Sequence, residues 1–315
     1  MNNQSCNQLV IGARGSKLSL WQANHIAERL RAAHPQLAVS VQTFVTTGDK
    51  ILDAPLAKIG GKGLFTKEIE TAMLAGAVDL AVHSLKDMPA ELPPGLVLAA
   101  VTERHDPGDA FVSRHYPSLA ALPPGARLGT SSLRRKAQLL AVRPDLDVAD
   151  LRGNVDTRLR KLDNGEYDAI VLAAAGLKRL GWGDRITQIL PQAICLPAVG
   201  QGALAIETRA GDTAVAGRVA CLEHSLTRQA VTAERAYLQV LEGSCQIPVG
   251  VYARIVDAQL QLSAVILSLD GKVKIEDRID GSPDAAAILG KALAERMLSA
   301  GGSELLAALT AKEEK

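Results

Sequence analysis

Arginine and serine side chains recur where the predicted β-strands end. In open α/β sheets, ligands bind beyond the carboxyl ends of the strands and near helix N-termini. Guanidinium groups there can bind carboxylates or phosphates through two parallel hydrogen bonds. A single surface arginine can equally be a solvated side chain, but the recurrence predicts a ligand with several anionic groups. The residues in such positions are Arg14, Ser16, Ser131, Ser132, Arg134, Arg135, Arg152 and Arg158.

A lysine–aspartate pair, Lys86 and Asp87, ends a predicted apolar strand from Asp79 to His83. A carboxylate in that position, among cations, remains ionised. It can stabilise a cationic intermediate or transfer a proton. The pattern alone also fits a structural ion pair or turn cap, and favours it over catalysis. His83 is predicted to be a packed strand residue rather than a base.

A cysteine, Cys245, follows Gly243 and Ser244 in a predicted loop between a long helix and a strand. Cysteines are usually buried, but one in such a loop is expected to be accessible. That setting suits a nucleophile or a point of covalent attachment. The sequence shows no such setting for the remaining cysteines, Cys6, Cys195 and Cys221.

Phosphate loops and metal sites are not indicated. Gly60, Gly61 and Gly63 lie close together, but the Walker spacing and its Gly-Lys-Ser/Thr ending are absent. The sequence has no H-E-x-x-H motif and no histidine cluster, so we expect no metal site.

Strands that alternate with helices are predicted to position these groups. Ser16 is a candidate N-cap for a helix that ends near Ala33, and the glycine-rich stretch from Thr46 to Gly63 is predicted to be a mobile loop. The alternation predicts parallel sheets covered on both faces. The other predicted strands are Gln8 to Gly12, Val39 to Val45, Leu96 to Val101, Arg127 to Gly129, Val148 to Leu151 and Asp168 to Leu172; the helices are Thr66 to Leu74, Ser132 to Ala141 and Val155 to Leu162.

The last third of the chain has a different pattern. A long helix from Ser225 to Leu241 precedes three consecutive predicted strands and a closing helix near Ala285 to Ser299. This order predicts a small α+β domain with an antiparallel sheet. The three strands are Val249 to Ile255, Gln259 to Leu267 and Val273 to Ile279.

Composition narrows the class of protein. Thirty-five Lys and Arg nearly balance 34 Asp and Glu, and this net charge of +1 argues against a general nucleic-acid or membrane-surface binder. With 315 residues, 47% of them hydrophobic, two or three domains are expected. We expect a cytoplasmic protein, because no apolar run spans a membrane, the first residues lack a signal-peptide core, and the four cysteines are widely spaced.

Seven segments in the same order resemble the porphobilinogen deaminase (hydroxymethylbilane synthase) family over nearly the whole chain. One segment alone would be weak evidence, whereas the ordered set is specific. Ser19 and Ser244 depart from the family pattern, which often has Ala and Gly there. The segments are Arg14-Gly15-Ser16 with Leu20-Trp21-Gln22, Gly60 to Phe65, Ala81 to Pro89, Gly129 to Arg135, Leu151 to Val155, Leu196 to Gly202 and Glu242 to Pro248.

The resemblance implies a transferase of porphyrin and haem biosynthesis. Such an enzyme condenses four porphobilinogen molecules, with release of ammonia, into the linear tetrapyrrole hydroxymethylbilane. The resemblance also implies a covalent dipyrromethane cofactor that primes the chain and is not consumed. It implies a monomer with a small-molecule substrate and with no nucleic-acid or membrane partner.

The resemblance also assigns roles to residues. It implies that Cys245 carries the cofactor through a thioether and that Asp87 is the catalytic carboxylate. Each pyrrole carries two carboxylates, so a growing chain needs many cations. A carboxylate beside the pyrrole N–H would stabilise the cation left by departing ammonia, and a thiolate can trap the same electrophile. The family positions match Cys245, Lys86, Asp87, Ser132, Arg134, Arg135 and Arg152 for the cofactor, Arg14, Ser16, Arg152, Arg158 and Arg179 for the substrate, and Lys58, Lys62 and Phe65 for a lid.

The implied fold is α/β, with two domains like type II periplasmic binding proteins and mainly parallel sheets. A small C-terminal α+β domain with a three-stranded antiparallel sheet follows. The segment near Leu196 to Thr208 is expected to return to the first domain. The implied boundaries are 1–102 with 200–222 for domain 1, 103–199 for the carboxylate-binding domain 2, and 223–315 for domain 3, where the cofactor is attached.

Two other functions remain open from the residues themselves. A non-catalytic module that binds a di- or tricarboxylate would explain the arginines and the two α/β lobes, but not the third domain or its loop cysteine. A thiol-dependent hydrolase would use Cys245 as a nucleophile. It predicts a thiol that iodoacetamide labels in the purified protein, whereas the synthase predicts a blocked one.

Overall fold

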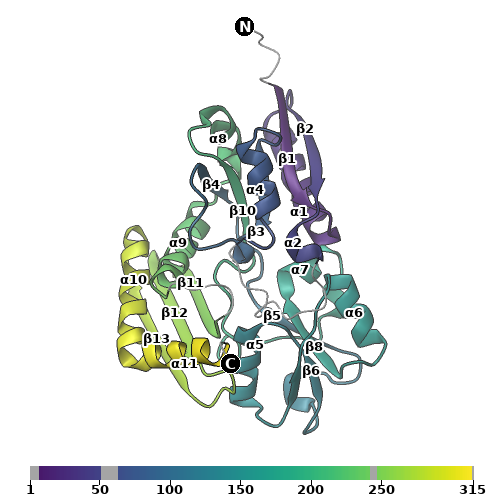
Figure 1. Cartoon of the computed structure of the whole chain (residues 1–315), viewed down its shortest axis with the longest axis vertical. Helices are drawn as coiled ribbons and strands as arrows, with labels where there is room; N and C mark the ends of the chain where they lie inside the picture. The colour runs from purple at the N-terminus through teal and green to yellow at the C-terminus, as the bar shows by residue number, and fades with distance from the viewer. Residues whose placement is uncertain (1–6, 51–62, 242–246, 314–315) are drawn as a thin grey trace. The chain divides into compact units, whose positions relative to one another are not determined.

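The computed structural model describes residues 7–50, 63–241 and 247–313, with side chains up to residue 308 (Figure 1). The chain divides into two compact units. The predicted three-domain division stays a prediction. Unit 1 comprises Met1–Leu52, Gly61–Arg104 and Ala203–Arg228, and unit 2 comprises Asp53–Gly60, His105–Gly202 and Gln229–Lys315.

Unit 1 contains a five-stranded sheet with helices on both faces. Its elements are β1 (Gln8–Arg14), α1 (Lys17–Ala33), β2 (Ala38–Phe44), α2 (Thr47–Lys50), α4 (Lys67–Leu74), β3 (Leu80–Ser84), the 3₁₀ turn η2 (Leu85–Asp87), β4 (Leu96–Val101), β10 (Leu204–Arg209), α8 (Thr213–Val219) and the 3₁₀ turn η5 (Ala220–Leu222). The strand order is β2-β1-β3-β10-β4. Strand β10 is antiparallel to both of its neighbours, while β1 is parallel to β2 and β3. The sheet is therefore mainly parallel with one reversed strand, which the chain enters on its return from unit 2.

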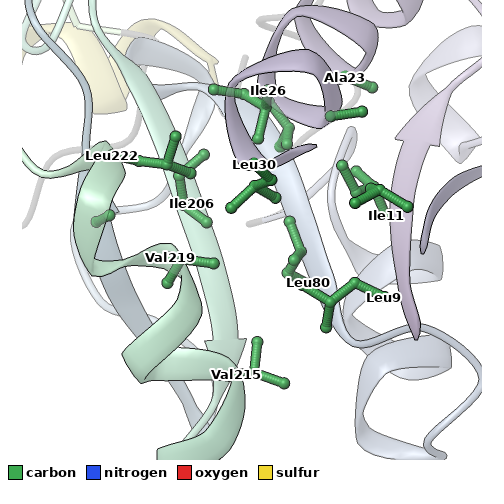
Figure 2. Packing of buried hydrophobic residues seen from close by; sticks show 14 of the residues in the cluster. Leu9, Ile11, Ala23, Ile26, Leu30, Leu80, Ile206, Val215, Val219 and Leu222 are labelled. Atoms are coloured by element: carbon green, nitrogen blue, oxygen red, sulfur yellow. The ribbon is translucent and has the colours of Figure 1, made fainter. Parts of the chain in front are cut away.

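Alternation along the strands builds the core of unit 1. Leu9 and Ile11 of β1 and Leu80 of β3 point toward Ile26 and Leu30 of α1 (Figure 2). All five side chains are at most 1% exposed, and burying each stabilises the fold by about 1.5–3 kcal/mol. The opposite face of β3 packs against α4, so this strand is covered on both sides. Burial of both faces fixes the register of β3 and therefore where its carboxyl end emerges.

Unit 2 begins with a second five-stranded sheet. Its elements are β5 (Asp109–Ser113), η3 (Leu119–Ala121), β6 (Arg127–Gly129), α5 (Leu133–Val142), β7 (Asp147–Ala149), α6 (Val155–Asp163), β8 (Ala169–Ala173), α7 (Ala174–Arg179), η4 (Gly183–Arg185) and β9 (Gln188–Ile189). The order is β7-β6-β8-β5-β9. Strand β5 is antiparallel to β8 and β9, while β6 is parallel to β7 and β8. In both sheets, the reversed strand is the one that follows a crossing of the chain between units.

The C-terminal part of unit 2 is a three-stranded antiparallel sheet of order β11-β12-β13. Helices α9 and α10 bury their apolar residues against it. Gly290 allows the two helices to approach closely, because a Cβ atom there would lie 2.2 Å from the carbonyl oxygen of Ala233. The elements are α9 (Ser225–Val240), β11 (Val249–Val256), β12 (Gln259–Leu267), β13 (Lys274–Gly281), η6 (Pro283–Ala285), α10 (Ala286–Met297), the π-turn η7 (Leu298–Gly302) and α11 (Ser303–Glu313).

The predicted fold class is confirmed by two mixed α/β sheets and a three-stranded antiparallel sheet. Ser16 caps α1 as predicted, by accepting the backbone N–H of Ser19. Ser132, predicted only as the start of a helix, caps α5 in the same way. The predicted loop from Thr46 is wrong at its start, where Thr47–Lys50 forms the helical turn α2. The hydroxyl and N–H of Thr47 both donate to Glu68 of α4, which holds this turn in place.

Candidate functional site

A cavity of about 50 Å³ in unit 1 lies where β1 and β3 end and α1 begins. It brings together four residues that the sequence assigned to three roles: Arg14 and Ser16 for the substrate, Phe65 for the lid, and Asp87 for catalysis. The strand-end rule therefore places the predicted groups at one site. The lining residues are Arg14, Ser16, Leu18, Ser19, Gln22, Phe65, Thr66, Val82, His83, Ser84 and Asp87.

Asp87 is presented to solvent by a short, well-anchored turn. It ends η2, directly after β3, and its neighbours Leu85 and Met88 are 1% and 3% exposed. The N–H of Leu85 donates to the carbonyl of Ala203, and the N–H of Met88 donates to that of Leu85. Two buried anchors on either side of an exposed carboxylate limit its motion, which is what a preorganised catalytic group requires.

Arg14 is held in a fixed orientation at the same cavity. Its Nε and Nη2 donate to the two carboxylate oxygens of Asp49, and its guanidinium carbon lies 4.2 Å from the centroid of the Phe65 ring. Burial would raise the pKa of Asp49, but hydrogen bonds from Arg14 and Thr46 outweigh it and lower this pKa. The Asp49 carboxylate is therefore ionised at neutral pH. Sequence analysis missed Asp49 because it lies 35 residues from Arg14.

Next to the cavity lies a buried group of ionisable side chains. His83 is 6% exposed, as expected of a packed strand residue, and its Nε2 lies 3.2 Å from an oxygen of the fully buried Glu207. Glu70 of α4 is also buried, and burial together with the charge of Glu207 raises its pKa. Of these residues, His83 is the one that also lines the cavity.

In unit 2, two predicted ligand loops are joined at one edge of the sheet. The hydroxyl of Ser131 donates to the carbonyl of Leu151 at 2.7 Å and accepts the N–H of Leu151 at 3.0 Å. This contact holds the loop that bears Ser132 beside the loop that bears Arg152. Arg158 lies in the helix that follows, and its Nε donates to the carbonyl of Gly153 at 2.7 Å.

Arg134 and Arg135 are 5% exposed each and share a fully buried carboxylate, Asp109. Nη1 of Arg134 lies 2.7 Å from one oxygen of Asp109, and Nε of Arg135 lies 2.9 Å from the other. Gln201 adds a third donor at 2.9 Å. Burial alone would raise the pKa of Asp109, but the two arginines hold it far below its ordinary value. The guanidinium groups of Arg134 and Arg135 are therefore held in the interior, which sequence analysis did not anticipate.

Two further buried groups border this cluster and the returning segment. Burial, together with the charge of Asp109, raises the pKa of the Cys195 thiol to about 12, so this thiol is protonated and unreactive at neutral pH. Arg179 is 7% exposed and donates from Nη2 to the carbonyl of Gly202 at 2.7 Å. Burial lowers the pKa of Arg179 to about 10, so the side chain remains a cation at neutral pH.

Several predicted residues cannot be placed. Cys245, Lys58 and Lys62 lie outside the described residues. The elements that flank Cys245 are described: α9 ends at Val240 and β11 begins at Val249. Lys86 lies on η2 beside Asp87.

The residues present fit a cofactor that carries several carboxylates. Nη1 of Arg152 is buried and has no hydrogen-bond partner among the described residues, and the same is true of Nε of Arg179. A buried guanidinium N–H without an acceptor is costly unless an anion occupies its neighbourhood. Within the described ranges, no group of three or more His, Cys, Asp or Glu residues is placed to hold a metal ion.

Comparison with protein families decides the assignment. A family model described as porphobilinogen deaminase, dipyromethane cofactor binding domain, matches residues 9–217, and one described as porphobilinogen deaminase, C-terminal domain, matches residues 228–299. The chain belongs to the porphobilinogen deaminase family. It is a transferase that condenses porphobilinogen into hydroxymethylbilane for porphyrin biosynthesis, and its cofactor is dipyrromethane. The match to the C-terminal domain also accounts for the part of the chain that a simple binding module leaves unexplained.

Solved structures with low sequence identity show a broader likeness. The chain is similar to the methionine binding protein MetQ, with 15% identity, a TM-score of 0.45, and 75% of this chain and 94% of that chain covered. A periplasmic substrate-binding protein of an ABC transporter from Coxiella burnetii has 15% identity and a TM-score of 0.43, covering 68% and 91%. The periplasmic aliphatic sulphonate binding protein SsuA from Escherichia coli has 14% identity and a TM-score of 0.41, covering 75% and 71%.

None of the described helices is both long and apolar enough to cross a bilayer.

Proposed function

We propose that Asp87 is the catalytic carboxylate of this transferase and that Arg14 and Ser16 bind a carboxylate of porphobilinogen beside it. The observation that carries the proposal is the shared cavity in which an anchored, exposed Asp87 lies with a fixed guanidinium and a helix-capping serine. Porphobilinogen combines carboxylates with a reacting centre that becomes cationic. The cavity therefore offers a cation for the first and an anion for the second.

The chemistry follows from these charges. The C–N bond of the protonated aminomethyl group (–CH2–NH3+) breaks with the electron pair leaving on ammonia, and the methylene pyrrole that remains is a cation. The Asp87 carboxylate stabilises this cation as it forms, because a fixed charge needs no reorganisation in the transition state. A pyrrole α-carbon then forms the new C–C bond and loses its proton, for which Asp87 is the proposed acceptor. Each cycle releases one ammonia and one proton.

The remaining assignments concern the cofactor and the growing chain. We infer that Cys245 carries dipyrromethane as a thioether and that Lys86, Asp87, Ser132, Arg134, Arg135 and Arg152 form its site, with Arg152, Arg158 and Arg179 also serving substrate units. When bound, dipyrromethane supplies the free α-carbon to which the first pyrrole is added. The partnerless N–H groups of Arg152 and Arg179 support direct contacts for these two residues. The ion pairs of Arg134 and Arg135 with Asp109 support a role in shaping the site.

We also infer a cytoplasmic monomer with a lid that includes Lys58, Lys62 and Phe65. Stacking of Phe65 on Arg14 supports its inclusion, because the ring covers a group of the proposed substrate site. The two described cysteines are both free thiols, which suits a reducing compartment.

The intact mass of the purified protein, with and without Cys245→Ser, tests the proposed attachment. A mass excess of two linked pyrroles that is absent in the variant is the expected result. Retention of the excess in Cys245→Ser would refute attachment at this cysteine. An unmodified wild type that stays inactive after porphobilinogen is supplied would refute the proposed cofactor site as a whole.

A further inference from the structure

Asp49 is placed to control how Arg14 meets the substrate. It lies on the turn α2, and its two carboxylate oxygens accept hydrogen bonds from Nε and Nη2 of Arg14. The distance from Nε to Oδ2 is 3.2 Å. The side chains of Arg14 and Asp49 are 20% and 21% exposed, so the pair is partly shielded from solvent. Shielding strengthens an ion pair and limits the conformations of its partners.

Asp49 is also held by a second residue, Thr46. The N–H and hydroxyl of Thr46 both donate to Oδ2 of Asp49, at 3.2 Å and 2.7 Å. Thr46 is fully buried, so this anchor belongs to the interior. The carboxylate is therefore held by Thr46 as well as by Arg14, and it fixes the position of the guanidinium.

Phe65 restrains the guanidinium of Arg14 on one face. Its ring lies against α2 because residue 48 is glycine: a Cβ atom there would lie 2.2 Å from a ring carbon. The same ring stacks on Arg14. Contacts at one edge and one face fix the orientation of the guanidinium. Ligand binding then costs little further side-chain entropy.

The contacts leave a defined part of Arg14 for a ligand. A guanidinium has five N–H donors and two edges that can each bind a carboxylate bidentately. Asp49 binds the Nε–Nη2 edge, and within the described ranges the hydrogen bonds of the Arg14 side chain all go to Asp49. Arg14 lines the cavity with Asp87, whereas Asp49 is not among the lining residues. The edge formed by Nη1 and Nη2 is thus the one that can bind a ligand carboxylate.

We propose that Asp49 is a positioning residue that presents the Nη1–Nη2 edge of Arg14 to a substrate carboxylate beside Asp87. Asp49 offsets part of the charge of Arg14, so recognition at this point depends on the direction of the remaining N–H donors as well as on charge. This inference rests on the proposed substrate role of Arg14. It predicts that loss of Asp49 impairs substrate capture, and that it does so only through Arg14.

Steady-state kinetics of the holoenzyme test this with Asp49→Asn, Arg14→Leu and the double variant. Asp49→Asn is expected to raise KM for porphobilinogen about tenfold with kcat changed less than about twofold, the loss expected for one charge-assisted contact. The matched control is Asp212→Asn, which breaks the Arg209–Asp212 pair of similar exposure, 25% and 21%, away from the cavity lining. This control is expected to leave both constants unchanged.

The double variant separates positioning from a general structural effect. If Asp49 acts through Arg14, the double variant has the KM of Arg14→Leu alone. Additive effects, an unchanged KM or a lowered KM in Asp49→Asn would overturn the inference, the last because it would mean that Asp49 competes with substrate. An unchanged KM in Arg14→Leu would instead refute the substrate role of Arg14 in the proposed function.

Discussion

Two arginine–aspartate arrangements in this molecule put the same chemistry to different uses. In unit 1, Arg14 and Asp49 are 20% and 21% exposed, and Arg14 lines a cavity. In unit 2, Arg134 and Arg135 share the fully buried Asp109 and are 5% and 7% exposed at their side chains. The first arrangement leaves N–H donors for a ligand, whereas the second is enclosed by the protein. Burial therefore distinguishes an arginine proposed to bind substrate from two that are proposed to shape the cofactor site.

Replacing the aspartate of each arrangement should give the largest difference between them, in the free energy of unfolding. Asp109→Asn leaves two buried guanidinium groups without a counter-charge and should lower the free energy of unfolding by about 3–5 kcal/mol. Asp49→Asn should lower it by about 1 kcal/mol or less, because its pair is partly solvated. Urea unfolding followed by circular dichroism measures both values. Equal losses in the two variants would show that the difference in burial has no energetic meaning.

Replacing the arginines should affect catalysis most in unit 1, whereas replacing the aspartates affects stability most in unit 2. Arg14→Leu should keep the stability within about 1 kcal/mol while kcat/KM falls about ten- to a hundredfold, as expected for a lost charged contact. Arg134→Leu should reduce stability first, since it also removes donors to Leu196 and Cys195. Unfolding and kinetics on the same preparations provide the check. A stable, fully active Arg134→Leu variant would contradict the structural role of this residue.

The pH dependence of folding stability should show a smaller difference between the two arrangements. The pKa of Asp109 is below its ordinary 3.8 in the folded state, so its contribution to stability is full above about 3.8 and decreases as the pH falls further. Asp49 follows the same sign, because its folded-state pKa is also lowered. The stability difference between wild type and Asp109→Asn should thus be constant from pH 7 to about 4 and shrink below. Urea midpoints at each pH measure it, and a difference that grows toward acid pH would disagree.

Local signals explain why much of the fold could be predicted. The N-cap at Ser16 and the bounds of Gln259–Leu267 follow from neighbouring residues. The reversed strands Leu204–Arg209 and Asp109–Ser113 were missed because their pairing depends on partners that the chain reaches only after crossing between units. A short apolar run does not reveal its direction in a sheet.

The site was predictable to a similar extent. The strand-end rule placed Arg14 and Asp87 together, since both follow parallel strands of one sheet. Asp49 and Asp109 were missed because a carboxylate partner is chosen by tertiary contact, at separations of 35 and 25 residues. For the same reason, sequence could not distinguish the partly exposed Arg14 from the buried Arg134.

Asp87 is the residue on which the proposed chemistry depends, and intact mass spectrometry of Asp87→Asn after brief exposure to porphobilinogen tests it most directly. The variant should carry the mass of the dipyrromethane cofactor but show no ladder of added pyrrole units. Its turnover should be at least about a hundredfold below that of wild type, as expected for loss of a catalytic carboxylate. A normal ladder at a normal rate would contradict the assignment of Asp87.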